Sequence, residues 1–463
     1  MIDLTRTTTS ATKDENREWI DHPESGRAWW MRRSSIKVIV ALALFIGALF
    51  TYYSGDATTN FHPDESRWLN RAHYIKDVID PFGSTWNDQY LTRGQPPVGS
   101  YVMGIGLLFQ GRDLDTNLAW DFRRTNEFNI ANGMYPQHDD LMAGRMTNNV
   151  LGALAVVVVF LVATNLTNMV GGIGASLLLI ANPLQNWHNR LALADTSLTL
   201  TLALILLCSI HLVRRPSWLK AALVGVLIGI GGANKLTPMS LCAPLAALGV
   251  SFLIRSWWSG RKVDNASLAG WKGLPPLNHL GWMFLSIPFT TGATFVLIYP
   301  YLWPDPIGRT LKLLKFRTGE MANQALLNPG LKVDGPVDAV RRTWTFLGDR
   351  WSGTQEFLRT VGLPGLGAAL SQLDVWLAMT GLLILAVLAV RKGMQSPHLI
   401  VFLLIVTETA TIIVTMKTDF ERYYLPIVLG FVVASGVAVG FLADAIWNVI
   451  DRRRTLARRE ASR

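Results

Sequence analysis

The chain of 463 residues has few cysteines and few charged residues. Its two cysteines, Cys208 and Cys242, each lie inside an apolar run, which excludes a disulfide framework and a metal site built from several cysteines. Charged residues make up 16% of the chain and hydrophobic residues 50%. Several apolar runs approach the roughly 20 residues that a helix needs to cross a bilayer. The sequence therefore predicts an all-α, multi-pass transmembrane helix bundle.

The apolar runs and their polar flanks predict about ten membrane spans. These spans cover residues 36–53, 146–165, 169–186, 196–213, 218–233, 238–254, 280–300, 374–390, 398–416 and 424–447. Residues 1–35 are too long and too acidic for the basic start of a signal peptide, so the first span is expected to stay as an anchor. Neither an internal repeat nor a separate soluble domain is visible, and residues 36–447 are expected to form one transmembrane domain.

The formal net charge of +10 is better explained by membrane topology than by a nucleic-acid partner. The densest basic run, within residues 448–463, directly follows the last predicted span. Basic pairs also flank other spans, such as Arg214 with Arg215 and Arg391 with Lys392. Because basic residues next to spans stay on the cytoplasmic side, one consistent threading follows. It predicts a plasma (inner) membrane protein with a cytoplasmic tail at 1–35 and a basic cytoplasmic tail at 448–463.

The same threading places two long loops, residues 54–145 and 301–373, on the external (periplasmic) face. Residues 96–110 form a short apolar run inside the first loop. An even number of crossings must lie between residues 54 and 195, so this run is expected to rest on the outer surface as a juxtamembrane helix, with a crossing left as the alternative. In the second loop, Ile307, Leu311 and Leu314 recur at helical spacing among basic residues, which predicts an interfacial helix.

A carboxylate pair, Asp64 and Glu65, follows the first span by about ten residues. A carboxylate pair there suggests chemistry at the membrane surface, or it can cap a helix that begins near Ser66. Glu65 can instead orient Asp64 or pair with Arg67 or Arg71. The neighbouring His62 is more typical of a hydrogen-bonding loop residue than of a metal ligand. No structural metal is predicted, and dependence on a divalent metal stays open.

Other polar residues stand where the predicted spans meet the external face. They are Gln95, Arg190, Asp195, Lys235, Arg422 and Tyr423. Cations at this edge can bind an anionic group at the membrane surface. Each residue also has a structural alternative. Asp195 can cap the span that follows it, Lys235 can snorkel at the end of its span, and Arg422 can anchor the interface beside aromatic residues.

Taken in order, these elements resemble the membrane-embedded glycosyltransferases of the C superfamily, in particular the protein O-mannosyltransferase and aminoarabinose transferase branch. The resemblance rests on Asp64-Glu65, Pro96-Pro97 and the segments 189–196, 234–237 and 421–426. It implies a helical membrane enzyme that moves a sugar from a polyprenyl-phosphate carrier to an acceptor hydroxyl on the outer side. It further implies a single displacement that inverts the anomeric carbon, with Asp64 as the base and with His62, Gln95, Arg190, Asp195, Lys235, Arg422 and Tyr423 around the substrates.

The resemblance makes mannose the leading sugar and leaves the acceptor open among a protein Ser or Thr, a glycolipid and a cell-wall glycan. Gln95 departs from the family pattern, in which mannosyltransferases have histidine and aminoarabinose transferases have lysine before Pro-Pro. Transfer of aminoarabinose or another pentose to a lipid or glycan is therefore the alternative reaction. A transporter or flippase is the alternative from another class, and it is disfavoured because the charges lie at the outer edges of the spans rather than at the midplane.

Overall fold

A computed structural model describes residues 34–262 and 275–461 of the chain. These residues form helices and contain no β-strand, only an isolated bridge between Lys332 and Thr418. The predicted all-helical fold class is confirmed. Residues 1–33 of the expected N-terminal tail and residues 462–463 of the basic tail lie outside the described residues.

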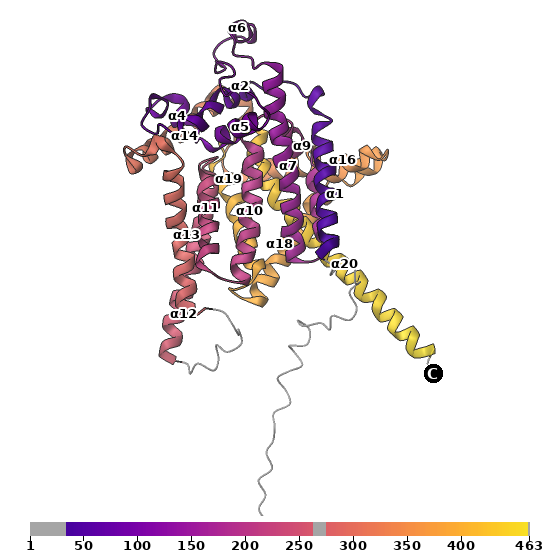
Figure 1. Ribbon diagram of the computed structural model, residues 1–463. Helices are drawn as coiled ribbons and strands as arrows, with labels where there is room; N and C mark the ends of the chain where they lie inside the picture. The colour runs from indigo at the N-terminus through magenta and orange to yellow at the C-terminus, as the bar shows by residue number, and fades with distance from the viewer. Residues whose placement is uncertain (1–33, 263–274, 462–463) are drawn as a thin grey trace, which may run out of the picture.

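The long helices pack side by side as a bundle (Figure 1). They are α1 (Ser34–Tyr53), α7 (His138–Leu166), α8 (Met169–Ala181), α10 (Asp195–Arg214), α11 (Trp218–Gly232), α12 (Cys242–Lys262), α13 (Leu277–Leu297), α18 (Leu373–Lys392), α19 (Pro397–Thr415) and α20 (Leu425–Ala461). Each predicted span overlaps one of these helices. In the described part of the chain, eight helices are long and apolar enough to cross a membrane. Helices α8 and α11 are shorter, with 13 and 15 residues. The chain is a multi-pass membrane protein.

Small residues let neighbouring helices of the bundle approach closely. Gly225 and Gly229 lie one turn apart on α11, and a Cβ at these positions would lie 2.9 and 2.8 Å from backbone carbonyl oxygens of α13. A Cβ at Gly381 on α18 would collide with the carbonyl oxygen of Ala434 on α20. Because apolar burial gives little attraction between helices inside a bilayer, close backbone packing of this kind holds such helices together.

The first long loop folds into short helices at one end of the bundle (Figure 1). They are η2 (Asp56–Thr58), α2 (Pro63–Asn70), η3 (Arg71–His73), α3 (Tyr74–Asp77), η4 (Ser84–Trp86), α4 (Tyr90–Gly94), α5 (Val98–Phe109) and α6 (Asn126–Ala131). Helix α5 corresponds to the ambiguous run 96–110. It packs on η3 and on α7 at the same end as α2 and α4, so it does not run the length of the bundle.

The second long loop is also helical. It contains η7 (Pro300–Leu302), α14 (Pro306–Leu327), η8 (Pro329–Leu331), α15 (Pro336–Thr345), the π-helical turn η9 (Phe346–Arg350), α16 (Gly353–Thr360) and α17 (Pro364–Ala369). The predicted interfacial helix is α14. Its residues Ile307, Leu311 and Leu314 are exposed, as expected for side chains that would face lipid.

Two element boundaries differ from the prediction. The predicted span 169–186 breaks after Ala181, and α9 (Pro183–Asn189) begins as a separate helix. Asn182 causes the break, because its side chain accepts a hydrogen bond from Gln185 N, and Pro183 occupies the first helical position, which proline favours. Helix α20 continues through the arginine-rich segment to Ala461, well past the predicted end at residue 447.

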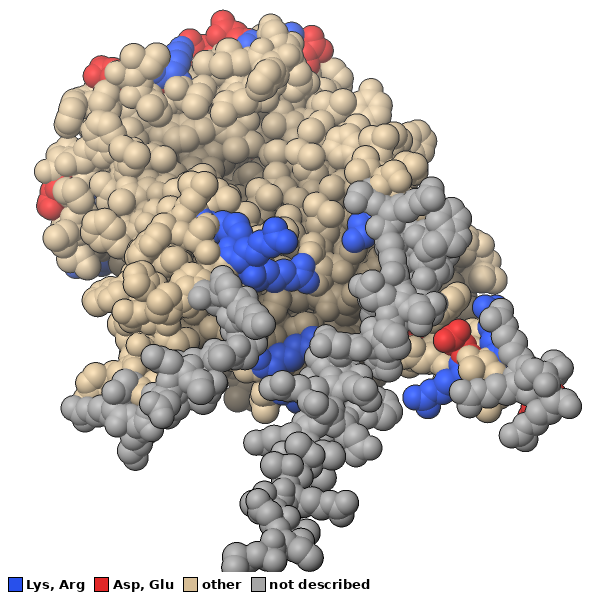
Figure 2. Space-filling model, turned by 60° about the horizontal axis from the view of Figure 1, so that its bottom comes forward, with Lys and Arg blue, Asp and Glu red and all other residues tan. Residues whose placement is uncertain are grey.

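The end of the bundle opposite to α2 is basic. Arg214 ends α10, and Arg391 and Lys392 end α18. Figure 2 brings this end forward and shows Lys and Arg side chains gathered on it. The positive-inside rule assigns such an end to the cytoplasm. The orientation of the chain stays a prediction, and this charge distribution agrees with it.

Candidate active site

The start of α2 is held by a reciprocal pair of hydrogen bonds between His62 and Glu65. His62 Nδ1 accepts from the backbone N–H of Asp64 at 3.1 Å, and a Glu65 carboxylate oxygen accepts from the backbone N–H of His62 at 2.9 Å. This is a capping box, completed by Pro63 at the first helical position. The helix begins at Pro63 rather than near Ser66. Capping is done by His62 and Glu65, which leaves the Asp64 side chain for another partner.

Glu65 is completely buried and pairs with Arg145 of α7. Arg145 Nε and Nη2 donate to the two carboxylate oxygens of Glu65, each at 2.9 Å, and the backbone N–H of Ala192 donates to Oε1 at 2.9 Å. Both oxygens are therefore engaged. The expected pairing of Glu65 with Arg67 or Arg71 is wrong. The partner lies 80 residues away in the sequence, on α7, which packs against α2.

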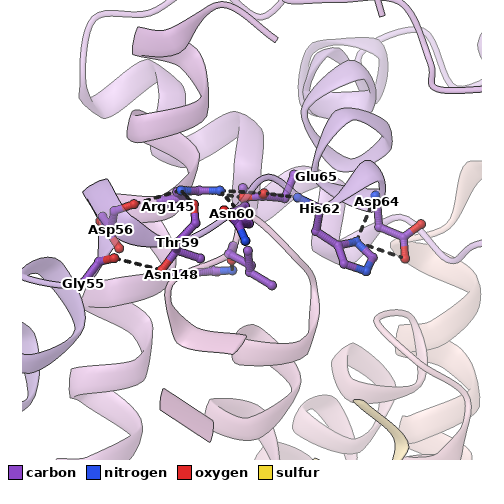
Figure 3. Close-up of polar contacts among 11 residues, drawn as sticks. Gly55, Asp56, Thr59, Asn60, His62, Asp64, Glu65, Arg145 and Asn148 are labelled. Carbon is purple, nitrogen blue, oxygen red and sulfur yellow. Dashed lines mark hydrogen bonds and ion pairs between the residues drawn. The ribbon is translucent and has the colours of Figure 1, made fainter. Parts of the chain in front are cut away.

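Arg145 extends this network toward the end of α1. Its Nη1 donates to the carbonyl oxygens of Asp56 and Thr59 at 3.0 and 2.9 Å, and Asn149 donates to Asp56 Oδ2 at 2.6 Å. Burial raises the pKa of Asp56 to about 6, although Asn149 and Arg145 act in the other direction. Figure 3 shows the Asp64 carboxylate pointing away from this network. The network fixes α2, and Asp64 projects from it.

Asp64 forms an ion pair with Arg422 of η10 (Glu421–Tyr424), which lies 358 residues later in the chain. The Asp64 side chain is 14% exposed. Burial opposes its ionisation, but the charge and the hydrogen bond of Arg422 contribute most to outweighing burial, and the pKa of Asp64 is held below its usual range. Asp64 is therefore an ionised carboxylate that can accept a proton.

A second ion pair joins Asp195 and Lys235. Asp195 is the first residue of α10 and is 3% exposed, and Lys235 follows the end of α11. The alternative in which Asp195 caps this helix is wrong. Ala194 is the N-cap residue, and no side chain makes a capping hydrogen bond there. Arg422 interacts electrostatically with Asp195 as well as with Asp64, so the two ion pairs are neighbours.

His188 of α9 lies beside these charges and was not singled out from the sequence. Its Nδ1 is 2.9 Å from the carbonyl oxygen of Leu184. Burial lowers the pKa of His188 to about 4, against the opposing influence of Asp195. His188 is therefore neutral at physiological pH. Its position seven residues before Asp195 is the sequence signal that could have found it.

The remaining predicted residues divide between the site and its surroundings. Gln95 precedes α5, whose first residue Val98 donates its N–H to the carbonyl oxygen of Ala233 at 2.9 Å, close to Lys235. Tyr423 OH donates to Gln324 of α14 at 3.4 Å. These contacts connect the ion-pair region with the start of α5 and the end of α14.

Arg190 lies apart from both ion pairs. Its Nη2 donates to the carbonyl oxygen of Thr51 at 2.9 Å, and its charge interacts mainly with Asp56. A Cβ at Gly55 would collide with its guanidinium, so the glycine makes room for this contact. Arg190 fastens α9 to the end of α1, and the structure does not bring it to Asp64.

The geometry offers proton transfer and anion binding at one end of the bundle. Asp64 supplies an ionised carboxylate, and Arg422 and Lys235 supply cations, each with a partly exposed side chain. Within residues 34–262 and 275–461, no group of three or more His, Cys, Asp and Glu residues is arranged to hold a metal ion. The charges suit a reaction in which a hydroxyl loses a proton while a nearby oxyanion forms.

Comparison with known proteins gives one match in sequence. Residues 130–271 match the family described as dolichyl-phosphate-mannose-protein mannosyltransferase. The match confirms over these residues the resemblance to carrier-dependent membrane glycosyltransferases. No curated protein matches the chain.

Several solved structures are distantly similar. ArnT from Cupriavidus metallidurans, bound to undecaprenyl phosphate, has a TM-score of 0.43 and 14% identity over 87% of this chain and 59% of its own. The Saccharomyces cerevisiae Pmt1-Pmt2 complex bound to the sugar donor has a TM-score of 0.39 and 12% identity, and the match covers 57% of this chain and 33% of that chain. The Archaeoglobus fulgidus oligosaccharyltransferase with a tethered acceptor peptide has a TM-score of 0.46 and 12% identity, and the match covers 92% of this chain and 51% of that chain.

Proposed function

We propose that this chain, whose residues 130–271 match the dolichyl-phosphate-mannose-protein mannosyltransferase family, is an inverting glycosyltransferase that uses a polyprenyl-phosphate sugar as its donor. One observation carries the proposal. The ion pairs Asp64–Arg422 and Asp195–Lys235 converge at one end of a membrane helix bundle, although they come from distant parts of the chain. They supply a proton acceptor and cations where a lipid carrier can present its sugar.

Asp64 is the base of the reaction. As the acceptor oxygen attacks the anomeric carbon, Asp64 takes the hydroxyl proton. The bond between the anomeric carbon and the phosphate oxygen breaks, and its electron pair leaves with the phosphate. A single displacement of this kind inverts the anomeric carbon. Glu65, whose two oxygens are engaged by Arg145 and Ala192, positions α2 and exchanges no proton.

Lys235 and Arg422 bind the carrier phosphate and stabilise the charge that it gains. In the protein without substrate, Arg422 is paired with Asp64. A phosphate that draws Arg422 away leaves Asp64 without its strongest favourable charge, so the pKa of Asp64 rises toward the range of an effective base. Binding of the donor thus activates the base, and Asp64 is kept a weak base until a donor is present.

The site opens on the external face, in agreement with the basic character of the opposite end of the bundle. Polyprenyl-phosphate mannose is the leading donor. The acceptor is a hydroxyl on a protein, a glycolipid or a cell-wall glycan. Helices of the loops 54–145 and 301–373, including α5 and α14, lie at the same end of the bundle as α2 and form the surface on which an acceptor arrives (Figure 1).

A panel of donors tests the proposal. The purified full-length chain, in lipid nanodiscs, is incubated with radiolabelled polyprenyl phosphates that carry mannose, glucose, aminoarabinose or another pentose. We expect one carrier to be consumed, and we expect Asp64→Asn to slow its consumption by roughly 10²- to 10⁴-fold. If no carrier is consumed while the reconstituted chain moves a lipid-linked sugar across vesicles, the chain is a flippase and the proposal is wrong.

A further inference from the structure

Arg71 in η3 is a completely buried cation without an anionic partner in the described parts of the chain. Its Nε donates to the carbonyl oxygen of Arg67 at 3.2 Å, but Nη1 and Nη2 are buried and have no hydrogen-bond partner. The guanidinium lies 4.3 Å from the ring centroid of Trp68 and 5.9 Å from that of Tyr74. Aromatic faces attract a cation, but they leave its N–H groups unsatisfied, and burial without hydrogen bonds is costly.

Arg145 shows what a structural arginine looks like in this protein. It is almost as buried, with 4% of its side chain exposed, yet its nitrogens donate to both Glu65 oxygens and to backbone carbonyls. Burial lowers the pKa of Arg71 to about 10, as expected for a cation with no adjacent anion, and the group stays protonated at neutral pH. Arg71 therefore lacks a partner that the fold supplies elsewhere.

Arg71 belongs to the same region as the proposed base. It follows Asp64 by seven residues, about two helical turns, which places both on one face of the segment formed by α2 and η3. Asp64 and Arg71 interact electrostatically. Trp68 lies between them in sequence, and its ring packs so close to the start of α5 that a Cβ at Gly99 would lie 2.6 Å from it.

The start of α5 offers further unsatisfied polar atoms. Ser100 Oγ, in its first turn, is buried without a hydrogen-bond partner in the part of the chain that the structure describes, and so is Gln95 Oε1 just before the helix. The N-terminus of a helix of this length also favours an anion. The charges of Asp64, Arg422, Asp195 and Lys235 cancel. Arg71 and Arg67, which both interact electrostatically with Asp64, leave the region with a net positive charge.

We propose that Arg71 binds one oxyanion of a substrate, a phosphate or a carboxylate, beside Trp68 and the start of α5. The inference rests on the proposed function, because it assigns the oxyanion to one of the two substrates. The oxyanion is either the phosphate of the polyprenyl carrier or an acidic group on the acceptor. Arg71 is a binding residue in this account, and Asp64 remains the base.

Binding of two lipids that differ only in charge tests the inference. Polyprenyl phosphate and the uncharged polyprenol of the same length are titrated into the full-length chain in nanodiscs. We expect Arg71→Met to weaken binding of the phosphate at least tenfold and to leave binding of the polyprenol unchanged. Arg71→Lys, which keeps the charge but loses the fork of donors, should lose less. The control is Arg112→Met in the same loop, where Arg112 pairs with Asp140, and it should alter neither affinity.

The acceptor arm separates the two sources of the oxyanion. If Arg71→Met leaves phosphate binding intact but raises the KM of an acidic acceptor relative to a neutral one, the oxyanion belongs to the acceptor. The inference is overturned if a folded variant weakens binding of both lipids equally. It is also overturned if the variant changes neither the affinity for either lipid nor the ratio of KM values for the acidic and neutral acceptors. If Arg71→Met does not fold, Arg71→Lys is used instead. The ratio of its affinities for the two lipids and the ratio of its KM values for the two acceptors then decide between the outcomes.

Failure of this inference is distinguishable from failure of the proposed function, because lipid binding is measured without turnover. If the wild-type chain consumes no donor but its phosphate binding depends on Arg71, the function fails and the anion site stands. If a donor is consumed and both Arg71 variants match the wild type in lipid affinities and in acceptor KM values, the function stands and Arg71 is a structural residue.

Discussion

Replacing Asp64 by asparagine should separate catalysis from donor binding. The amide cannot take a proton, and a positioned general base contributes roughly 10²- to 10⁴-fold to a rate, so kcat should fall by about that factor. The amide also cannot neutralise Arg422. The affinity for polyprenyl phosphate should therefore rise in the same variant, because the phosphate no longer competes with the carboxylate for this cation.

The size of the affinity gain follows from the burial of the pair. The Asp64 and Arg422 side chains are 14% and 29% exposed, which lies between a surface pair, worth about 0–1 kcal/mol, and a buried pair, whose disruption costs about 3–5 kcal/mol. An intermediate value of about 1–2 kcal/mol corresponds to roughly 5- to 30-fold tighter binding.

Initial rates with a labelled donor and equilibrium binding of polyprenyl phosphate measure the two effects on purified Asp64→Asn. Asp115→Asn is the matched control, since Asp115 is an exposed carboxylate of the same loop that pairs with Lys76. It should change neither quantity. Near-normal turnover by a folded Asp64→Asn variant would remove Asp64 from the role of base. Weaker rather than tighter lipid binding would refute the competition between Asp64 and the phosphate.

Four further outcomes are expected. Glu65→Gln should lower the free energy of unfolding by about 3–5 kcal/mol, because Arg145 is left as a buried unpaired charge; thermal unfolding in detergent measures this, and an unchanged melting temperature would contradict it. Lys235→Met should weaken polyprenyl phosphate binding about tenfold, and equal affinities would return Lys235 to an anchoring role. Gly381→Ala should separate α18 from α20 and cost about 1–3 kcal/mol or more, seen as a lower melting temperature. Because the pKa of Asp64 is lowered in the folded protein, its ion pair should stabilise the fold at neutral and mildly acidic pH and lose this effect only as the pH falls below about 4. The melting temperatures of wild type and Asp64→Asn should converge only there.

The predictable part of this fold is the part that local pattern determines. Each apolar run produced a helix, and the rule that basic flanks share one side correctly grouped Asp64, Asp195, Lys235 and Arg422 at one end of the bundle. The sequence also carried a usable signal for the break between α8 and α9, since Asn182-Pro183 combines an N-cap residue with a proline at the first helical position.

The pairing of side chains within that end was not predictable. Glu65 meets Arg145 because α7 packs against α2, and no spacing in the sequence encodes this contact. Asp195 stands where a helix cap is favoured, yet its carboxylate pairs with Lys235. Burying an unpaired charge costs far more than losing one cap, so tertiary contact outweighs the local preference. Arg190 looked equivalent to Arg422 in sequence, but it lies at the end of α1, where it donates to the carbonyl oxygen of Thr51.

The most direct test of the central claim is a structure of the full-length chain with polyprenyl phosphate bound. We expect the phosphate within hydrogen-bond distance of Lys235 and Arg422, with Arg422 turned from Asp64 toward the phosphate and the Asp64 carboxylate free to face an acceptor. A phosphate bound at the opposite end of the bundle, near Arg214 and Lys392, or an Asp64–Arg422 pair left intact beside a phosphate held elsewhere, would contradict the account.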